Sequence, residues 1–564
     1  MGGLTERLAA PVERIGRIVR RRRLDGRLPE PTARLLRDLA KLTLLTKVSR
    51  STALVTKPLA RHAMALAPGE PPPGRWRRWR TTEQLEVPLS ELSHRLATPV
   101  VKKLEEVGLA PFLIEHDRHH VHIGLMADDR RPALEALRQL DESSSWYLDA
   151  RRGHRWSLHE VDSVGARRAL RSESWRVFRC WSVGPELVAG PGQAIEISFW
   201  TTGSEGRAER LGYRGLHRME ADTPRSTESV DGHVYPGSAA FPVGRSLTRF
   251  REPIDVVYTW VDGDDPVWSA SLEEWKRAEG PDPRGEQAAH SSRYTSRDEL
   301  RYSLRSVWLN AGWVRHIYVV TADQVPEWLI EDDRLSVVSH RDIFPADALP
   351  TFNSHAIESR LHHIQGLAEH FIYFNDDMFL GREVTPEQFF TPNGLSRFFE
   401  SEARVPTPSG GPDLAVDTAA RRGQRLIDDE FGSVVTHKLH HAPYALRRSV
   451  MAEVEQRFPE VVGPTTARRF RHPDDLSIPS AFAHHYGFAT GRALPAELHV
   501  GYENLGSRNL ALFLRRALLG RDFDAFCINE TERWESEPER ATAQVVAFFE
   551  QYFPLPSPWE RRVG

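Results

Sequence analysis

The sequence predicts an α/β fold for residues 250–564, preceded by an α+β domain and by N-terminal helices. Three apolar runs, Ile254–Trp260, Ile317–Thr321 and Phe371–Phe374, have the pattern of buried strands. Segments with helical periodicity separate them, and this alternation is typical of a parallel sheet with helices on its faces. The first and third runs end in acidic turns, which we expect at the carboxyl edge of the sheet, where open α/β folds bind ligands.

Length and composition bound the function. The chain has 564 residues, enough for two or three domains, and is 40% hydrophobic and 27% charged, as globular proteins are. Its net charge of -3 gives no reason to expect a nucleic-acid partner. Two distant cysteines form neither a disulfide framework nor a zinc spacing, which favours a reducing compartment. Because we find no membrane-length apolar run and no secretory signal, we expect a cytoplasmic protein.

Residues 1–75 are predicted to form a basic helical segment that ends in a Pro-rich linker at 67–75. Arg17 and Arg20–Arg23 form a basic cluster beside Ile18. Such a cluster could dock on the anionic inner face of a membrane. The alternative is a solvated helix end.

Residues 76–245 are predicted to form an α+β accessory domain with a terminal linker. Residues 203–245, rich in Gly, Ser, Pro and charge, are the expected linker or loop-rich part. The histidines between 116 and 122 are not expected to form a metal site, because a strand points neighbouring side chains to opposite faces and they would not converge on one ion. The expected helices are Leu89–Leu109 and Arg131–Leu140, and the expected strands are Phe112–Glu115, His120–Leu125, Trp146–Asp149, Val177–Val183 and Ala194–Trp200.

Two acidic turns are the first candidates for a site. The turn after Ile254–Trp260 contains Asp262 and Gly263, and the glycine permits a tight turn and close approach of a ligand to the backbone. The other turn holds Asp376 and Asp377, and adjacent carboxylates need a cation, a basic group or a shared proton. An ordinary turn after a strand is the alternative for both.

The helix predicted over Asp298–Asn310 adds positive charge. Arg297, Arg301 and Arg305 lie four residues apart and share a face, and guanidinium groups pair bidentately with phosphate. A solvated face is the alternative. Together with the acidic turns and the later His and Arg motifs, this face suggests an enzyme that handles a phosphate or diphosphate.

The rest of the α/β region is expected to alternate helices and strands around an insertion. Residues 403–425, rich in Pro, Gly and Ser, are predicted to be a flexible insertion. Ser336–His340 is a predicted strand, and the predicted helices are Asp323–Leu329, Ile357–His370, Tyr444–Phe458, Ser480–Phe488 and Glu537–Phe553.

Several long motifs resemble the Stealth family, in the order that family has them. They are IDVVYTWVDGDDP (254–266), the block from 296 to 329, IES with FIYFNDDMFL (357–380), HAPYALRRSVMAEVEQRFPE with FRHPDD (441–475), and CINE with YFPLPSPWE (527–560). That family includes bacterial capsule and exopolysaccharide phosphotransferases and the animal enzyme that adds N-acetylglucosamine-1-phosphate to lysosomal glycoproteins. The region before 250 is more loosely similar to actinobacterial exopolysaccharide members.

The resemblance implies a Rossmann-like, glycosyltransferase-A-like catalytic domain over 250–564. It also implies transfer of a hexose-1-phosphate from a nucleotide-sugar, UDP-linked in our expectation, to a sugar hydroxyl of an oligo- or polysaccharide, with release of the nucleoside monophosphate. The rivals are a metal-dependent glycosyltransferase that releases a diphosphate and an inactive carbohydrate-binding module.

By motif, Glu358, Asp377, His441 and Arg471 match the family's catalytic positions. We expect Asp377 or His441 to be the base for the acceptor hydroxyl, Arg471 to bind the developing phosphate charge, and Glu358 to orient a partner or the sugar. Asp376 with Asp377 would hold Mg²⁺ or Mn²⁺. His441, which precedes a proline, could instead only close a turn.

The resemblance also implies a substrate-binding set. The first motif would receive the nucleotide, and the arginine face would meet the diphosphate. Arg301 and Arg305 could instead form structural ion pairs, and Asp255 could only cap a strand. The predicted set is Asp255, Trp260, Asp262, Gly263, Arg297, Arg301, Arg305 and Asn375.

Overall fold

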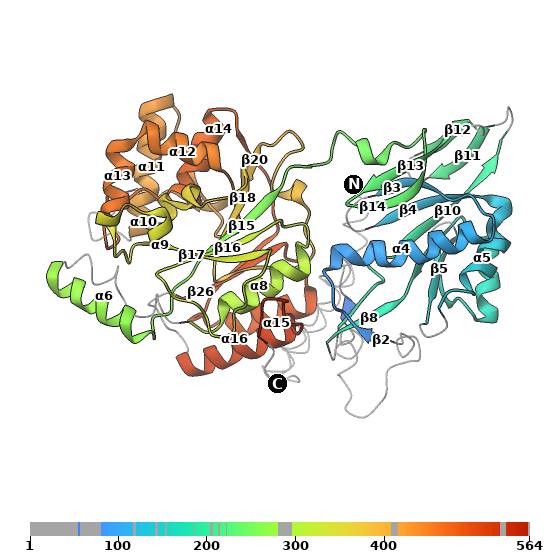
Figure 1. Ribbon diagram of the computed structural model, residues 1–564, viewed down its shortest axis with the longest axis horizontal. Helices are drawn as coiled ribbons and strands as arrows, with labels where there is room; N and C mark the ends of the chain where they lie inside the picture. Colours follow the sequence, from blue (N-terminus) through green and yellow to red (C-terminus); the bar gives the residue numbers. More distant parts are fainter. Residues whose placement is uncertain are drawn as a thin grey trace, which may run out of the picture.

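In the computed structural model the chain forms two bodies that lie side by side, the first built around an antiparallel-rich sheet and the second around a largely parallel one (Figure 1). The predicted N-terminal helices, the Pro-rich linker and the basic cluster lie outside the described residues. The structure describes Val55–Thr56 and residues 81–561, except 117–119, 142–144, 153–154, 185–186, 204–206, 213–214, 221–222, 280–295, 408–414 and 531–536.

The accessory body has an eight-stranded sheet with α4 (Leu89–Glu106) and α5 (Arg130–Leu137). Its longest path runs β12-β11-β10-β7-β5-β6, and β4 pairs with β10 and with β3. A smaller sheet has the order β1-β9-β8-β2. The strands of the large sheet are β3 (Phe112–His116), β4 (Val121–Met126), β5 (Tyr147–Arg152), β6 (Arg155–Glu160), β7 (Ser174–Phe178), β10 (Ile195–Thr202), β11 (Arg207–Gly212) and β12 (Gly215–Glu220); those of the small sheet are β1 (Val55–Thr56), β2 (Thr81–Gln84), β8 (Cys180–Gly184) and β9 (Leu187–Ala189).

The prediction that 203–245 is a linker or loop-rich part is wrong. This region forms two hairpins, β11-β12 and β13-β14, the latter from Arg225–Val230 and His233–Ser238. Hairpins with one face in water carry polar residues at alternate positions, which lowers their apolar signal. The single strand predicted over Val177–Val183 is likewise two strands, β7 and β8, that belong to different sheets.

The second body confirms the predicted α/β class and Rossmann-like order. Its five-stranded sheet runs β17-β16-β15-β18-β23, with the first four strands parallel and β23 antiparallel. The chain leaves β15 toward β16 and β17 and then returns to the other side of β15 as β18, so the order reverses between β15 and β18. The strands are β15 (Ile254–Thr259), β16 (Ile317–Thr321), β17 (Leu335–Ser339), β18 (His370–Asn375) and β23 (Tyr444–Arg447).

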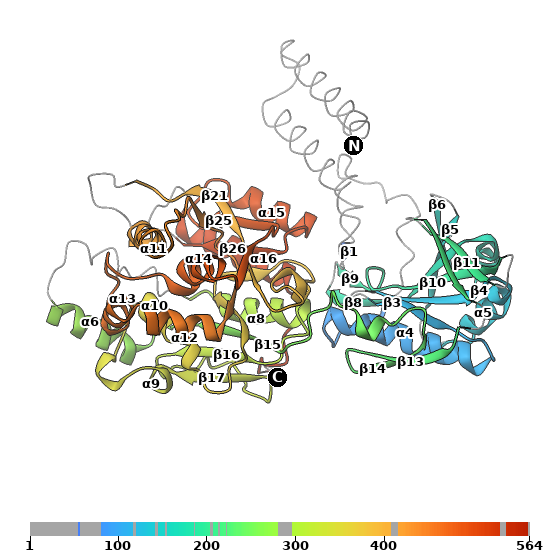
Figure 2. The ribbon, with the colours of Figure 1, turned by 90° about the horizontal axis from the view of Figure 1, so that it is seen from above.

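A separate three-stranded sheet has the order β19-β26-β25, and helices lie around both sheets (Figure 2). None of the helices in the described part of the chain combines the length and apolar character needed to cross a membrane. The further elements are β19 (Met378–Leu380), β20 (Ser396–Phe398), β21 (Glu400–Arg404), β22 (His437–Leu439), β24 (Ala493–Pro495), β25 (Val500–Asn504), β26 (Ala525–Asn529), α6 (Pro266–Glu279), α8 (Glu299–Asn310), α9 (His340–Ile343), α10 (Ser354–Ser359), α11 (Ala415–Phe431), α12 (Arg448–Arg457), α13 (Pro459–Ala467), α14 (Ala483–Ala489), α15 (Leu510–Gly520) and α16 (Pro538–Tyr552).

Several helix predictions are corrected. The helix expected over Ile357–His370 is α10 followed by a 3-10 turn at Leu361–His363, and Asp323–Leu329 contains no helix. The segment Tyr444–Phe458 begins as strand β23 before α12 starts. The predicted insertion 403–425 includes part of α11, an amphipathic helix that composition alone concealed.

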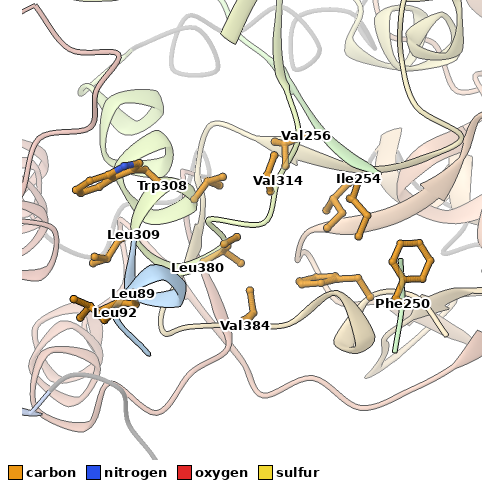
Figure 3. Close-up of a cluster of buried hydrophobic side chains, with 14 of the residues drawn as sticks. Leu89, Leu92, Phe250, Ile254, Val256, Trp308, Leu309, Val314, Leu380 and Val384 are labelled. Atoms are coloured by element: carbon orange, nitrogen blue, oxygen red, sulfur yellow. The ribbon is translucent and has the colours of Figure 1, made fainter. Parts of the chain in front are cut away.

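The two bodies share one hydrophobic core. Leu89 and Leu92 of α4 belong to the same buried cluster as Trp308 and Leu309 of α8 (Figure 3). A Cβ on Gly312 would lie 2.6 Å from the Pro88 Cβ, so the close approach of the chains requires glycine there. The accessory body therefore packs directly on the catalytic one.

Candidate active site

The acidic turns after β15 and β18 meet at the carboxyl edge of the sheet. Thr259 pairs with Asn375 in register, so the chain leaves both strands at the same level. The crevice between strands that flank a reversal of order is the usual ligand site of open α/β sheets. Residues 371–374 are fully buried, whereas Asn375, Asp376 and Asp377 are only partly covered.

Asp377 is held between β18 and β26. Its main-chain oxygen accepts a hydrogen bond from the Ile528 N–H at 3.3 Å, and its Oδ2 accepts one from the Cys527 Sγ at 3.2 Å. Its Oδ1 has no hydrogen-bond partner among the described residues. Burial and then the Asp377 charge raise the pKa of Cys527 well above its usual value, so this thiol remains protonated and can donate.

His441 faces Asp377 from the segment before β23. Its Nε2 lies 3.4 Å from Asp377 Oδ1, and its Nδ1 lies 3.2 Å from the Tyr444 hydroxyl oxygen. Burial opposes the charged imidazole, but the carboxylates of Asp377 and then Glu358 outweigh it and raise the pKa of His441. The imidazole therefore holds its proton more firmly than an ordinary histidine does.

Glu358 of α10 lies behind this pair. It is buried, its Oε1 accepts a hydrogen bond from the Tyr373 hydroxyl at 3.3 Å, and its Oε2 has no partner among the described residues. Burial raises the pKa of Glu358, while the positive charges of His355 and Arg471 oppose that rise. A buried carboxyl with a free oxygen is suited to accept a hydrogen bond from a ligand.

Arg471 joins the group through α10. Its Nε donates to the Ser354 Oγ at 3.0 Å, and Ser354 is the first residue of that helix. Asp475 ties the residue before α10 to the segment before Arg471. Its buried carboxylate accepts hydrogen bonds from the Asn353 Nδ2 at 2.9 Å and from the Arg468 Nη1 at 3.0 Å. The structure thus brings together all four predicted catalytic residues, which are spread along the chain between positions 358 and 471.

A third carboxylate joins the acidic pair. Burial, then Asp377 and then Glu299 raise the pKa of Asp376 well above its usual value. Burial also raises the pKa of Glu299, with a smaller contribution from Asp377. Carboxylate oxygens are the donors that Mg²⁺ and Mn²⁺ prefer, and Asp376 and Asp377 would supply them to such an ion. The sequence analysis did not single out Glu299 as a site residue.

The same site contains a second donor set. One ligand atom each from Asp377, His441 and Cys527 lie within 4.8 Å of one another. Thiol and imidazole donors suit softer ions than Mg²⁺.

Asp255 does not belong to the site. It lies near the start of β15, at the opposite edge of the sheet, and is fully buried. Its carboxylate accepts from the Arg315 Nε at 2.8 Å, the Arg315 Nη2 at 2.5 Å and the Ala368 N–H at 2.7 Å. The predicted nucleotide contact is therefore replaced by a structural role.

Two arginines of the predicted diphosphate face are also bound within the protein. Glu560, which is buried, accepts from the Arg301 Nε at 2.7 Å and from the Arg305 Nε and Nη2 at 2.7 and 2.6 Å. The structural ion pair is thus the observed arrangement. Arg297 pairs with Glu530 at 2.8 Å and lies 3.6 Å from Glu299, beside the acidic group.

The first motif lies at the carboxyl edge, as predicted. Gln324 clamps the Asp262 backbone by donating to its oxygen at 2.9 Å and accepting from its N–H at 3.0 Å. The Gly263 oxygen accepts from the Ser269 hydroxyl at 2.5 Å. Trp260 is half-buried against the core. Trp260, Asp262, Gly263 and Asn375 therefore all lie at the carboxyl edge of the sheet.

Comparisons with known proteins agree with these motifs. Four segments match the models of Stealth protein conserved regions 1 to 4, at residues 252–280, 293–398, 440–488 and 516–564. An exopolysaccharide phosphotransferase of Streptomyces coelicolor is 50% identical over 85% of this chain and 92% of its own length. The exopolysaccharide phosphotransferase CpsY of Mycobacterium tuberculosis is 40% identical over 66% of this chain and 70% of its own length.

One solved structure is also similar. The galactosyltransferase LgtC, in complex with donor and acceptor sugar analogues, aligns with 54% of this chain and 96% of its own, at 11% identity and a TM-score of 0.28. At that score the likeness carries no argument.

Proposed function

The chain belongs to the Stealth family, and on that premise we propose that this transferase moves a hexose-1-phosphate from a nucleotide-sugar to a sugar hydroxyl of an exopolysaccharide. The acceptor oxygen attacks the β-phosphorus of the donor, the bond between that phosphorus and the bridging oxygen breaks, and a nucleoside monophosphate leaves. A phosphodiester forms, and the sugar carbon keeps its bond to oxygen.

The observation that carries the proposal is the placement of a base beside two cationic groups and a buried acid. Because the pKa of His441 is raised, the imidazole holds its proton, which favours Asp377 as acceptor of the hydroxyl proton. Arg471 and the imidazolium of His441 then face the charge that develops on the phosphoryl oxygens. Glu358 orients the sugar through its free oxygen.

A divalent cation is part of the proposal. Mg²⁺ or Mn²⁺ on Asp376 and Asp377 would neutralise the donor diphosphate when bound. Glu299 adds negative charge to that group, and Arg297, which lies 3.6 Å from Glu299, offsets part of that charge. The cytoplasmic location, the UDP-linked donor and the contact with the inner face of the membrane also remain predictions.

Product analysis tests the proposal. Purified protein is incubated with UDP-N-acetylglucosamine and other nucleotide-sugars, Mg²⁺ and oligosaccharide acceptors, and the nucleotides are separated by chromatography. Release of UMP with a phosphodiester-linked product is expected. Release of UDP would instead identify a glycosyltransferase. A chelated sample is the control for the metal and should lose turnover.

A further inference from the structure

A polar cavity lies on the accessory body, in a part of the chain that the proposed reaction does not use. It has a volume of about 310 Å³, within the range of small-molecule sites. Its lining contains acidic, basic and aromatic side chains from the large sheet. They are Glu115, His120, His122, Trp156, Arg176 and Glu196.

Strand register explains why these residues meet. Side chains of directly paired residues point to the same face of a sheet. Six residues are paired in this way across adjacent strands, so they form one row on the face away from α4. In spatial order the row is Leu158, Asp149, Arg176, Glu196, His122 and Glu115.

The row has the length of an oligomer. It crosses six strands from β6 to β3, and five steps of about 4.8 Å give about 24 Å. Arg210 of β11 closes one side, since its Nη2 lies 3.3 Å from the Glu196 Oε1. The cavity together with this row of side chains, which we call the groove, has a length that several sugar rings would span.

An exposed tryptophan stands beside the row. Trp156 is 42% exposed, an unusual degree for this residue type. The guanidinium carbons of Arg151 and Arg176 lie 6.0 and 5.7 Å from its ring centroid, and these cation–π contacts restrict the indole. A fixed aromatic surface next to hydrogen-bonding groups suits the apolar C–H face of a sugar ring.

The charges indicate what kind of ligand fits. Along the row, three carboxylates alternate with the Arg176 guanidinium and the His122 imidazole, so neither a polyanion nor a polycation is favoured over its whole length. A neutral polyhydroxylated ligand can donate to the carboxylates and accept from the arginines at the same time.

We propose that this groove binds the acceptor glycan, as a neutral oligosaccharide stretch stacked on Trp156. The inference rests on the proposed function for the identity of its ligand. A polysaccharide held on the accessory body has a raised effective concentration at the catalytic crevice. The groove therefore serves long acceptors and has no effect on short ones.

Binding by the full chain tests the groove without any donor. Titration calorimetry uses maltohexaose, cellohexaose and chitohexaose as uncharged probes. The native chain should bind at least one of them, and Trp156→Ala and Glu196→Gln should weaken that binding by about tenfold or more. Leu247→Ala, which removes an apolar side chain that is 92% exposed, is the matched control and should bind normally.

Kinetics provide the second readout. Both groove variants should raise KM for a long acceptor and leave kcat with a monosaccharide acceptor unchanged. Binding of none of the three probes by the native chain, or equal binding by Trp156→Ala with a normal melting temperature, would overturn the groove. If the native chain binds glycan but releases a nucleoside diphosphate, the proposed function fails and the groove stands.

Discussion

The two edges of the catalytic sheet each carry an acid, Asp255 within β15 and Asp377 in the turn after β18, but only one of them is fully paired. At the amino edge, both oxygens of Asp255 accept from Arg315, and one also accepts from a backbone N–H. At the carboxyl edge, Asp377 Oδ1 has no hydrogen-bond partner among the described residues, and His441 lies 3.4 Å away. Of these two acids, the one that lies in the candidate active site is the one with a carboxylate oxygen that accepts no hydrogen bond.

The arginines differ in the same way. Arg305 makes two hydrogen bonds to the Glu560 carboxylate. Among the described residues, the hydrogen-bond partner of Arg471 is the neutral Ser354 hydroxyl. Its charge is therefore available for a phosphate, whereas that of Arg305 is already used.

The sharpest test of the open edge is Asp377→Asn. Turnover should fall by about 10²- to 10⁴-fold, the usual contribution of a general base, because the amide cannot take the acceptor proton. Donor binding, measured by calorimetry without added divalent cation so that the proposed metal contact of Asp377 does not contribute, should stay near the native value. An equal loss of donor binding would mean that Asp377 holds the donor rather than activates the acceptor.

At the closed edge, Arg315→Ala should destabilise the fold and spare the chemistry. It leaves the fully buried Asp255 without its cation, which costs about 3 kcal/mol of unfolding free energy. Arg341→Ala removes half of an exposed pair with Asp323 and should cost less than about 1 kcal/mol. Denaturant unfolding measures the free energy of unfolding of both variants. Normal stability with lost turnover in Arg315→Ala would show that Asp255 and Arg315 serve the reaction and not the fold.

Arg305→Gln should have a smaller effect. Glu560 keeps Arg301, so the loss is about 1–2 kcal/mol of stability, and KM for the donor should not change. Arg471→Gln is the companion variant and should instead lower kcat by about 10²-fold or more. A raised donor KM in Arg305→Gln would restore the predicted contact with the diphosphate.

Two histidines of the same body should respond differently to pH. Burial and then His485 lower the pKa of His484 to about 3, whereas that of His441 is raised. As the pH falls below about 6.5, the unfolded chain takes up a proton at position 484 and the folded chain does not, so stability is lost toward pH 3. One pH unit below 6.5, this effect lowers the free energy of unfolding of the native chain by about 1.4 kcal/mol. Denaturant titrations of His484→Gln should not show this part of the loss. An unchanged pH profile in the variant would show that His484 does not titrate this way.

The apolar strands β15, β16 and β18 were predictable because strands covered on both faces leave uninterrupted apolar runs. The hairpins within 203–245 were not, because their polar faces give the composition of a linker. The prediction for 357–370 made the helix too long, because apolar residues continue with helical spacing although the helix ends at Ser359.

The residues of the candidate site that belong to recognisable motifs could be predicted from the sequence. Roles that depend on ion pairs between residues far apart in the chain could not. Sequence could name Glu358, Asp377, His441 and Arg471, which the fold gathers. It could not show that Glu560 binds Arg305, because these residues are 255 positions apart. Glu299 was missed for the same reason, since its closeness to Asp376 depends on how α8 packs against β19.

The central claim is that phosphorus moves together with the sugar, and following the β-phosphorus tests it most directly. A nucleotide-sugar labelled with ³²P only at the β-phosphate is incubated with the native chain, Mg²⁺ and acceptor, with Asp377→Asn as the inactive control. The account predicts that the label enters the glycan product and that the released nucleotide is unlabelled. Label that stays in a released nucleoside diphosphate would contradict it.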